Sequence, residues 1–319
     1  VGSEMCIRDS PKAGTSLIAS LLDGHLEIVA YPEETMFFRR FLPAIQNATY
    51  QEKLNLAEKL LINIFEWNLE NPPEHQKNYP DRDYSDISYN AVREEMIRNF
   101  VSSNENPADF LNAVMLSFGK VTGLLTDVSK HWLEKTPYNE LYTKEIFSWW
   151  GNPKCIHIVR DPRGNFYSYE RKHADWSARI FGKNWVRSTT AGLRNVKTYG
   201  KNRYMMIRFG DLLTNPAEKM AEVADFLDIR MTEILLKPTR LSEFWHGNSM
   251  FNETYQSIST APLTRWEGHL DIYDQMMIEA ICGRLMKELD FKTSSLDSRG
   301  LKFAQRLKIW REKLIAGVK

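Results

Sequence analysis

One short stretch near the start of the chain carries residue types that bind a phosphate group. It reads Pro11-Lys12-Ala13-Gly14-Thr15-Ser16 and runs directly into an apolar segment. The turn leaves the first N–H groups of the following helix facing an anion, and the helix dipole adds to their attraction. Lys12 can reach the same anion as a point charge, while Thr15 and Ser16 can cap the helix or donate their hydroxyls. The stretch predicts an anion-binding loop.

The order of these residues differs from that in the common nucleotide-hydrolysing enzymes. Those enzymes carry G-x-x-x-x-G-K-[ST], in which the lysine directly follows the last glycine. Here Lys12 precedes Gly14 by two residues, and Thr15 follows the glycine. The pattern favours a different phosphate loop and leaves a P-loop kinase of a small metabolite as an alternative.

A second phosphate-binding pattern lies where a predicted strand ends. Residues 154–159 form a short apolar run with β-branched side chains, which indicates a buried strand. Arg160 follows it at the carboxyl end, where ligands collect in open α/β sheets. Ser168 lies eight residues later, on the helix predicted after Gly164. An arginine fork with a nearby hydroxyl suits a second phosphate.

Together these two segments resemble the sulfotransferases that use 3′-phosphoadenosine 5′-phosphosulfate (PAPS). In that family a P-K-x-G-T-[ST] loop holds the 5′-phosphosulfate, and an R-D-P strand end with a later serine holds the 3′-phosphate. The motif style is closest to that of the carbohydrate sulfotransferases. Further stretches resemble the family in the same order: Tyr31–Phe38, Trp132–Pro137, Tyr204–Leu227, Gly247–Phe251 and Arg265–Trp266.

The resemblance implies roles for individual residues. Lys12 would neutralise the charge that grows on the leaving phosphate oxygen, and Glu34 would take the proton of the acceptor. Phe37 and its neighbours would desolvate Glu34 and make it a stronger base. Glu33 and His25 stay open as alternative bases. The residues expected around the nucleotide are Pro11, Lys12, Ala13, Gly14, Thr15, Ser16, Arg160, Ser168, Asn248, Ser249, Arg265 and Trp266.

Lys135, at the end of another predicted strand, has two interpretations. It either faces the substrate or forms a salt bridge. The acceptor itself is expected to be a hydroxyl or amine of a glycan, a lipid or a small molecule. A non-catalytic nucleotide-binding protein of the same fold is a further alternative.

Composition narrows the remaining function classes. The chain has 319 residues, 43% of them hydrophobic and 26% charged, which is ordinary for a soluble globular protein. A net charge of +1 gives no broad electrostatic surface for nucleic acid. No apolar run of about 18 residues predicts a membrane span, so a cytoplasmic location is expected. The spacing of the three Cys and seven His predicts neither a disulfide framework nor a metal site.

Strand and helix patterns alternate along the chain, which predicts an α/β fold with a central parallel sheet flanked by helices, of the P-loop-like sulfotransferase kind. The polar segment 70–86 is expected to be a surface excursion that could act as a lid. Strands are predicted at 26–30, 132–134, 154–159 and 203–207, and helices at 16–23, 52–67, 89–100, 108–118, 139–150, 176–199, 217–227 and 274–289.

Residues 1–293 are predicted to form one sulfotransferase domain, followed by a linker and a C-terminal helix in residues 294–319. The basic amphipathic stretch 301–316 is a candidate for contact with a membrane surface or a partner. Residues 1–9 carry three charges, unlike a central parallel strand. They are interpreted as truncated, foreign or wrongly read sequence. If native, they are expected to make a poor first strand.

Overall fold

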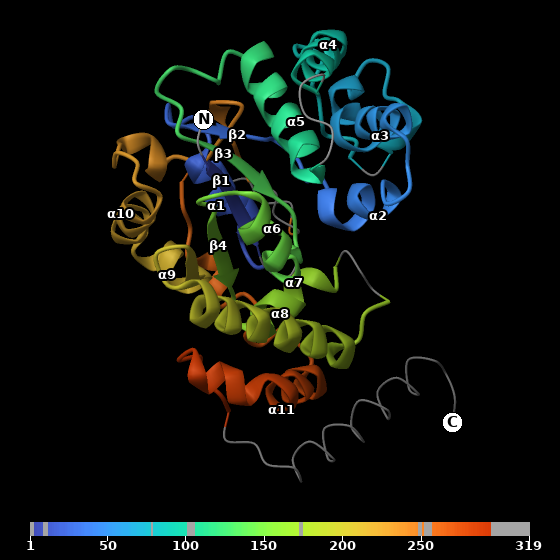
Figure 1. Cartoon of the computed structure of the whole chain (residues 1–319). Coiled ribbons are helices and arrows are strands. Elements are labelled where there is room, and N and C mark those ends of the chain that lie inside the picture. Colours follow the sequence, from blue (N-terminus) through green and yellow to red (C-terminus); the bar gives the residue numbers. More distant parts are fainter. Residues whose placement is uncertain are drawn as a thin grey trace, which may run out of the picture.

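A five-stranded parallel sheet forms the centre of the molecule (Figure 1). The computed structural model describes residues 3–8, 12–77, 79–100, 106–171, 175–247, 251 and 257–294. The strand order is β2-β3-β1-β4-β5, and every pairing is parallel. The predicted α/β fold is confirmed. The strands are β1 (Ser3–Arg8), β2 (Ile28–Ala30), β3 (His131–Lys135), β4 (Lys154–Val159) and β5 (Tyr204–Arg208).

The first strand departs from expectation. Despite its charged residues, β1 lies in the middle of the sheet and pairs along its length with β3 on one side and β4 on the other. Backbone N–H and C=O groups make these ladders, so charged side chains do not prevent them. The prediction of a poor first strand is therefore wrong for the backbone. The loop that carries Lys12 follows a central strand.

Alternate strand residues bury opposite faces of the sheet. Ile156 and Ile158 of β4 pack in a cluster with α1 (Thr15–Leu22), α9 (Phe209–Thr214) and α10 (Pro216–Leu227). Cys155 points to the other face, into a cluster that includes residues of α5 (Pro107–Val121). Burial on both faces is typical of a parallel sheet covered by helices.

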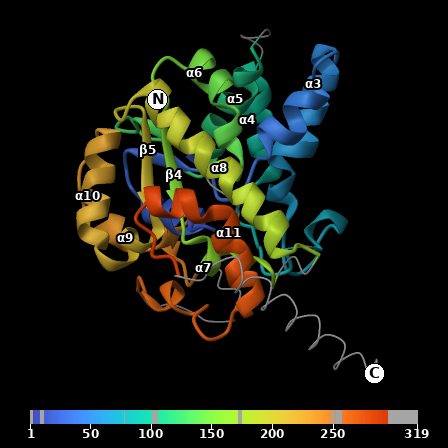
Figure 2. The ribbon, with the colours of Figure 1, turned by 90° about the horizontal axis from the view of Figure 1, so that it is seen from below.

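The carboxyl-terminal helices form a further layer. The long helix α8 (Ala178–Tyr199) lies beside the sheet, and α11 (Ile272–Glu288) packs across it (Figures 1 and 2). Gly182 of α8 allows this close approach, because a Cβ atom there would lie 3.3 Å from the side chain of Ile281. The short helix α7 (Pro162–Tyr169) connects β4 to this layer.

The segment between β2 and β3 forms a separate helical region on the opposite side of the sheet from α10 (Figure 1). The predicted helix 52–67 is continuous but changes type along its length, from α to π to 3-10. Its first turn is held by a Thr49–Glu52 capping box. The elements here are the π-turn η1 (Phe37–Phe41), α2 (Leu42–Ala44), α3 (Tyr50–Ala57), the π-turn η2 (Glu58–Ile62), the 3-10 turns η3 (Asn63–Glu66) and η4 (Glu74–Gln76), α4 (Tyr89–Phe100) and α5.

Several shorter elements join the longer helices and strands. The predicted helix 139–150 is split into a 3-10 turn and α6. None of the described helices is long and apolar enough to cross a membrane. Residues 295–319, with the predicted C-terminal helix, lie outside the described residues. The remaining elements are η5 (Asn139–Leu141), α6 (Thr143–Trp149), η6 (Glu233–Leu236), the antiparallel pair β6 (Thr239–Arg240) and β7 (Glu243–Phe244), and η7 (Ala261–Leu263).

Candidate active site

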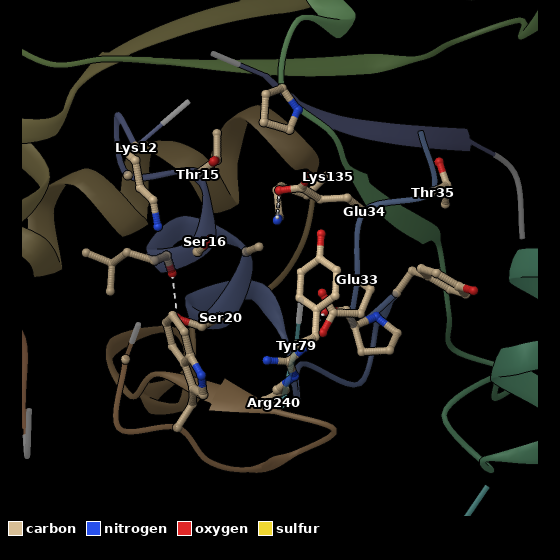
Figure 3. A pocket seen from close by; sticks show the side chains of 18 of the residues that line it. Lys12, Thr15, Ser16, Ser20, Glu33, Glu34, Thr35, Tyr79, Lys135 and Arg240 are labelled. Atoms are coloured by element: carbon tan, nitrogen blue, oxygen red, sulfur yellow. Dashed lines mark hydrogen bonds and ion pairs between the residues drawn. The ribbon is translucent and has the colours of Figure 1, made fainter. Parts of the chain in front are cut away.

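A cleft of about 1450 Å³ opens where the carboxyl ends of the central strands meet. Lys135 ends β3, while Arg160 and Phe209 directly follow β4 and β5; all three side chains line it. Lys12 and Glu34 also line it, so the two predicted catalytic residues face one space. Figure 3 shows the loop of Lys12, Thr15 and Ser16 on one side and the Glu34–Lys135 pair across from it.

The anion loop depends on unusual backbone angles. Lys12 has φ 68° and Gly14 has φ 118°, the left-handed region. A Cβ atom on Gly14 would lie 2.3 Å from the Phe209 ring, so only glycine fits. Gly14 is also the N-cap of α1, which has no side-chain cap hydrogen bond. The expectation that Thr15 or Ser16 caps the helix is therefore wrong; the side chains of both line the cleft.

Arg160 ties the anion loop to the rest of the cleft. Its Nη1 donates to the Lys12 carbonyl at 3.1 Å, and its Nη2 donates to the Pro262 carbonyl at 3.0 Å. The guanidinium also lies over the Phe209 ring, 5.1 Å from the centroid. Ser168, on α7, also lines the cleft, and its hydroxyl donates to the Gly164 carbonyl at 3.1 Å. The structure thus brings both predicted phosphate sites to one cleft.

Across the cleft, Glu34 is held by an ion pair. Lys135 Nζ donates to Glu34 Oε1 at 2.9 Å, with the lysine side chain 12% exposed and the glutamate 30% exposed. Burial alone would lower the pKa of Lys135, but the nearby carboxylates, Glu34 first, outweigh it and raise that pKa. The predicted salt bridge of Lys135 and its cleft-facing position are both present. Phe37, which was expected to desolvate Glu34, packs into the aromatic core. The Glu34 carboxylate contacts Lys135.

A buried carboxylate fixes the position of this pair. Glu134 is fully buried at the end of β3 and accepts hydrogen bonds from the hydroxyls of Thr35, at 2.8 Å, and Thr136. The amide of Asn139 donates to its other oxygen at 2.7 Å. Thr35 directly follows Glu34, so Glu134 joins the β2 loop to the β3 end. This junction sets Glu34 beside Lys135.

The two alternative bases are engaged elsewhere. Glu33 accepts hydrogen bonds from Arg240 and from the Tyr84 hydroxyl at 2.7 Å, and it lies 3.2 Å from Arg82 Nε. His25 is buried, with Nδ1 accepting from the Glu27 amide at 3.2 Å and Nε2 placed 2.9 Å from the Arg230 carbonyl. That pairing assigns the proton to Nε2. Both ring nitrogens serve the fold, and His25 is not among the residues lining the cleft.

The C-terminal part of the predicted nucleotide site divides in two. Arg265 lines the cleft and lies over the Phe251 ring, 4.3 Å from the centroid. Trp266 instead packs in the core: its ring lies under Arg163 at 4.3 Å, and its indole N–H donates to Leu263. It is not among the cleft residues. Ala13 is fully buried behind the loop. Pro11, Asn248 and Ser249 lie outside the described residues.

The sequence did not reveal several residues that line the cleft. Tyr79 comes from the 70–86 segment and stacks on Trp67 with ring centroids 4.8 Å apart. Figure 3 shows Tyr79 near the Glu34–Lys135 pair, and burial, together with the charges of Glu34 and Glu33, raises the pKa of Tyr79. In the sequence, only the prediction that segment 70–86 is a functional loop pointed to Tyr79. Within the described residues, no group of three or more His, Cys, Asp or Glu side chains is arranged for a metal ion.

The chain matches known proteins in family and in fold. A model described as sulfotransferase family matches residues 10–233. The sulfotransferase domain from the curacin biosynthetic pathway shares 17% identity, with 92% of this chain and 99% of that one covered, at a TM-score of 0.61. The sulfotransferase domain of the Synechococcus PCC 7002 olefin synthase shares 18% identity, with 92% and 96% covered, at a TM-score of 0.59.

At such identities these two structures show the shared fold, which agrees with the predicted P-loop-like sulfotransferase architecture. A search of curated proteins found no match. The family match covers well over half of the chain and includes the anion loop, the Glu34–Lys135 pair and the Arg160 strand end. This protein belongs to the sulfotransferase family.

Proposed function

We propose that the protein transfers the sulfuryl group of PAPS to a hydroxyl or amine of a small-molecule, lipid or glycan acceptor. The observation that carries the proposal is the single cleft with Lys12 on one wall and the Glu34–Lys135 pair on the other. A sulfuryl transfer needs charge neutralisation at the leaving oxygen and a base at the acceptor. The two walls offer one group for each task.

The residues around the anion loop fit a nucleotide that carries two separate anionic groups. Gly14 has no side chain to cover the backbone of the loop, and any side chain there would collide with Phe209. Backbone turns with positive φ, such as those at Lys12 and Gly14, form concavities that accept anions. Lys12, Thr15, Ser16, Arg160, Ser168 and Arg265, which all line the cleft, would hold the nucleotide. When bound, PAPS supplies the sulfuryl group that is transferred.

Lys12 and Glu34 divide the chemistry. Lys12 holds a positive charge beside the loop, where negative charge grows as the sulfur–oxygen bond breaks. Glu34 accepts the proton of the acceptor hydroxyl or amine at one of its carboxylate oxygens. Lys135 orients that carboxylate through the 2.9 Å ion pair. Because Glu34 is about one third exposed, an acceptor in the cleft can reach it.

A direct test is single-turnover transfer from sulfur-labelled PAPS to a panel of hydroxyl and amine acceptors. The proposal predicts a labelled product, loss of that product in Lys12→Ala, and full transfer in the presence of EDTA. An absence of transfer together with magnesium-dependent ATP turnover would support the small-metabolite kinase instead. Tight binding of PAPS without transfer to any acceptor would indicate a non-catalytic nucleotide-binding protein.

A further inference from the structure

The cleft is far more positive than the protein as a whole. Among the described residues, ten basic and four acidic side chains line it, a net charge of +6, whereas the whole chain carries +1. A nucleotide bound near Lys12 and Arg160 would account for part of that excess. Most of the remainder lies at the acceptor end of the cleft, the wall that carries Glu34 and Lys135.

The acidic residues at the acceptor end are already balanced by other cations. Glu33 is paired with Arg82 and Arg240. Glu34 is paired with Lys135, and Asp81 lies 3.7 Å from Arg82. None of these carboxylates is therefore left to balance the other basic side chains of this wall.

Two of those basic residues are placed by the π-turn η1. The sequence Phe37-Phe38-Arg39-Arg40-Phe41 buries all three phenylalanines in the aromatic core. The two intervening arginines must then point away from the core, and both are exposed and line the cleft. Single-turn π-helices such as η1 are rare and occur frequently at functional sites. The core itself thus presents two adjacent guanidinium groups to the cleft.

A third cation comes from the neighbouring π-turn. Lys59 lies on η2, which packs Leu61 and Ile62 into the same core, and its side chain is exposed and lines the cleft. The adjacent Glu58 is paired with Arg93 at 2.8 Å and does not line the cleft. Within the part of the chain that the structure describes, Arg39, Arg40 and Lys59 form no ion pair with a carboxylate.

The surroundings of these cations are flat and aromatic. The Arg39 guanidinium lies over the Tyr138 ring, 5.3 Å from the centroid. Tyr79 stacks on Trp67, with ring centroids 4.8 Å apart. Tyr138, Tyr79 and Trp67 all line the cleft. An apolar body can therefore lie on aromatic rings while an anionic group meets the cations beside them.

We propose that the acceptor carries an anionic group, a phosphate or a carboxylate on an apolar body, and that Arg39, Arg40 and Lys59 bind it. The inference rests on the proposed function, because it concerns the acceptor of that reaction. Arginine pairs suit this role, since a guanidinium matches a carboxylate or phosphate with two parallel hydrogen bonds. The three cations then select anionic acceptors over neutral analogues of the same shape.

The test is calorimetry with naphthyl phosphate, naphthoate and naphthol, in the presence of saturating adenosine 3′,5′-bisphosphate to fill the nucleotide end. Both anions should bind roughly 10- to 100-fold more tightly than naphthol, the scale of one charged hydrogen bond. In the double variant Arg39→Gln/Arg40→Gln this preference should fall to within about threefold. The affinity for the bisphosphate should not change.

A charge-matched control separates the site from net charge. Arg179 and Arg194 are exposed on α8 and do not line the cleft, so Arg179→Gln/Arg194→Gln removes the same charge elsewhere. Equal affinities for naphthol and the anions, no measurable binding of either anion, or an equal loss in the control would overturn the proposal. If the bisphosphate itself does not bind, the proposed function fails, and titration without it still tests the anion site.

Discussion

The two ends of the cleft are built in different ways. At the proposed nucleotide end, Lys12, Thr15 and Ser16 are neighbours in one loop, with Gly14 and the start of α1 shaping the backbone. At the acceptor end, side chains from distant segments hold one another. Glu34 and Lys135 are 101 residues apart, and Glu33 and Arg240 are 207 apart. The loop of the first end is a local sequence motif, whereas the contacts of the second end form only when distant segments come together.

Two neighbouring carboxylates at the acceptor end have different surroundings. Glu33 and Glu34 are adjacent in sequence, yet Glu33 is enclosed by Arg240, Arg82 and Tyr84. Glu34 has one lysine partner, and about 30% of its side-chain surface is exposed. We infer that Glu33 maintains the acceptor wall and that Glu34 reacts there. Substitutions at each end should therefore fail in different ways.

The largest effect is expected at Glu34. Glu34→Gln removes the base while keeping the shape of the side chain, and kcat should fall by about 10²–10⁴. Affinity for adenosine 3′,5′-bisphosphate should stay within twofold, because the residue does not belong to the nucleotide end. Steady-state kinetics with labelled PAPS and calorimetry measure the two quantities. Glu218→Gln, at an exposed site on α10, is the matched control. A near-normal kcat would place the base at another residue.

Lys12 should show the next largest effect. Lys12→Ala removes the cation that meets charge growing on the leaving oxygen, so kcat should fall by roughly 10²–10³. Single-turnover rates at saturating PAPS isolate this chemical step from binding. If the variant weakens PAPS binding but keeps the single-turnover rate, Lys12 only binds the nucleotide, and the proposed division of labour is wrong.

Gly14 tests the backbone origin of the nucleotide end. In Gly14→Ala the new Cβ atom would lie 2.3 Å from the Phe209 ring, at a φ of 118°. Such overpacking costs about 1–3 kcal/mol of unfolding free energy, with a further cost from the backbone angle. Urea unfolding and bisphosphate titration should both show a loss. Pairing the change with Phe209→Ala relieves the collision but not the angle, so partial recovery of affinity relative to Phe209→Ala alone is expected.

The smallest effect is expected at the Glu33 network. Tyr84→Phe removes a donor to Glu33 and an acceptor for Arg240 but leaves the ion pairs of Glu33 with both arginines, so the unfolding free energy should fall by only about 1–2 kcal/mol. Because Glu33 is not the base in this account, kcat should change less than twofold. Urea unfolding and steady-state kinetics test both numbers. A large loss of kcat with unchanged stability would move Glu33 into the chemistry.

Elements that carry a local sequence pattern were predicted from the sequence, whereas contacts between distant segments were not. Strand β4 was predicted with its observed bounds, and helix α1 within one residue of them, because both carry local apolar patterns. The loop at Lys12 and the strand end at Arg160 were likewise found from short motifs. Trp266 was expected beside the nucleotide and lies buried under Arg163, a position that depends on the packing of α7, which no local pattern contains.

The acceptor end illustrates what sequence could not provide. Glu34 was named from its motif, but its partner was left open between two interpretations of Lys135. Their approach depends on Glu134, which binds Thr35 and Thr136 from different segments. Similarly, β1 was doubted for its charges, although its backbone pairs on both sides. In each case the deciding contact joins residues far apart in the chain.

Whether the cleft holds two phosphate sites is measured by calorimetry of the wild-type protein with adenosine 3′,5′-bisphosphate and with AMP. The account predicts tighter binding of the bisphosphate by about 1.5–3 kcal/mol, the scale of a charged hydrogen bond, and loss of that difference in Arg160→Gln. Equal affinity of the wild-type protein for the two nucleotides would contradict it.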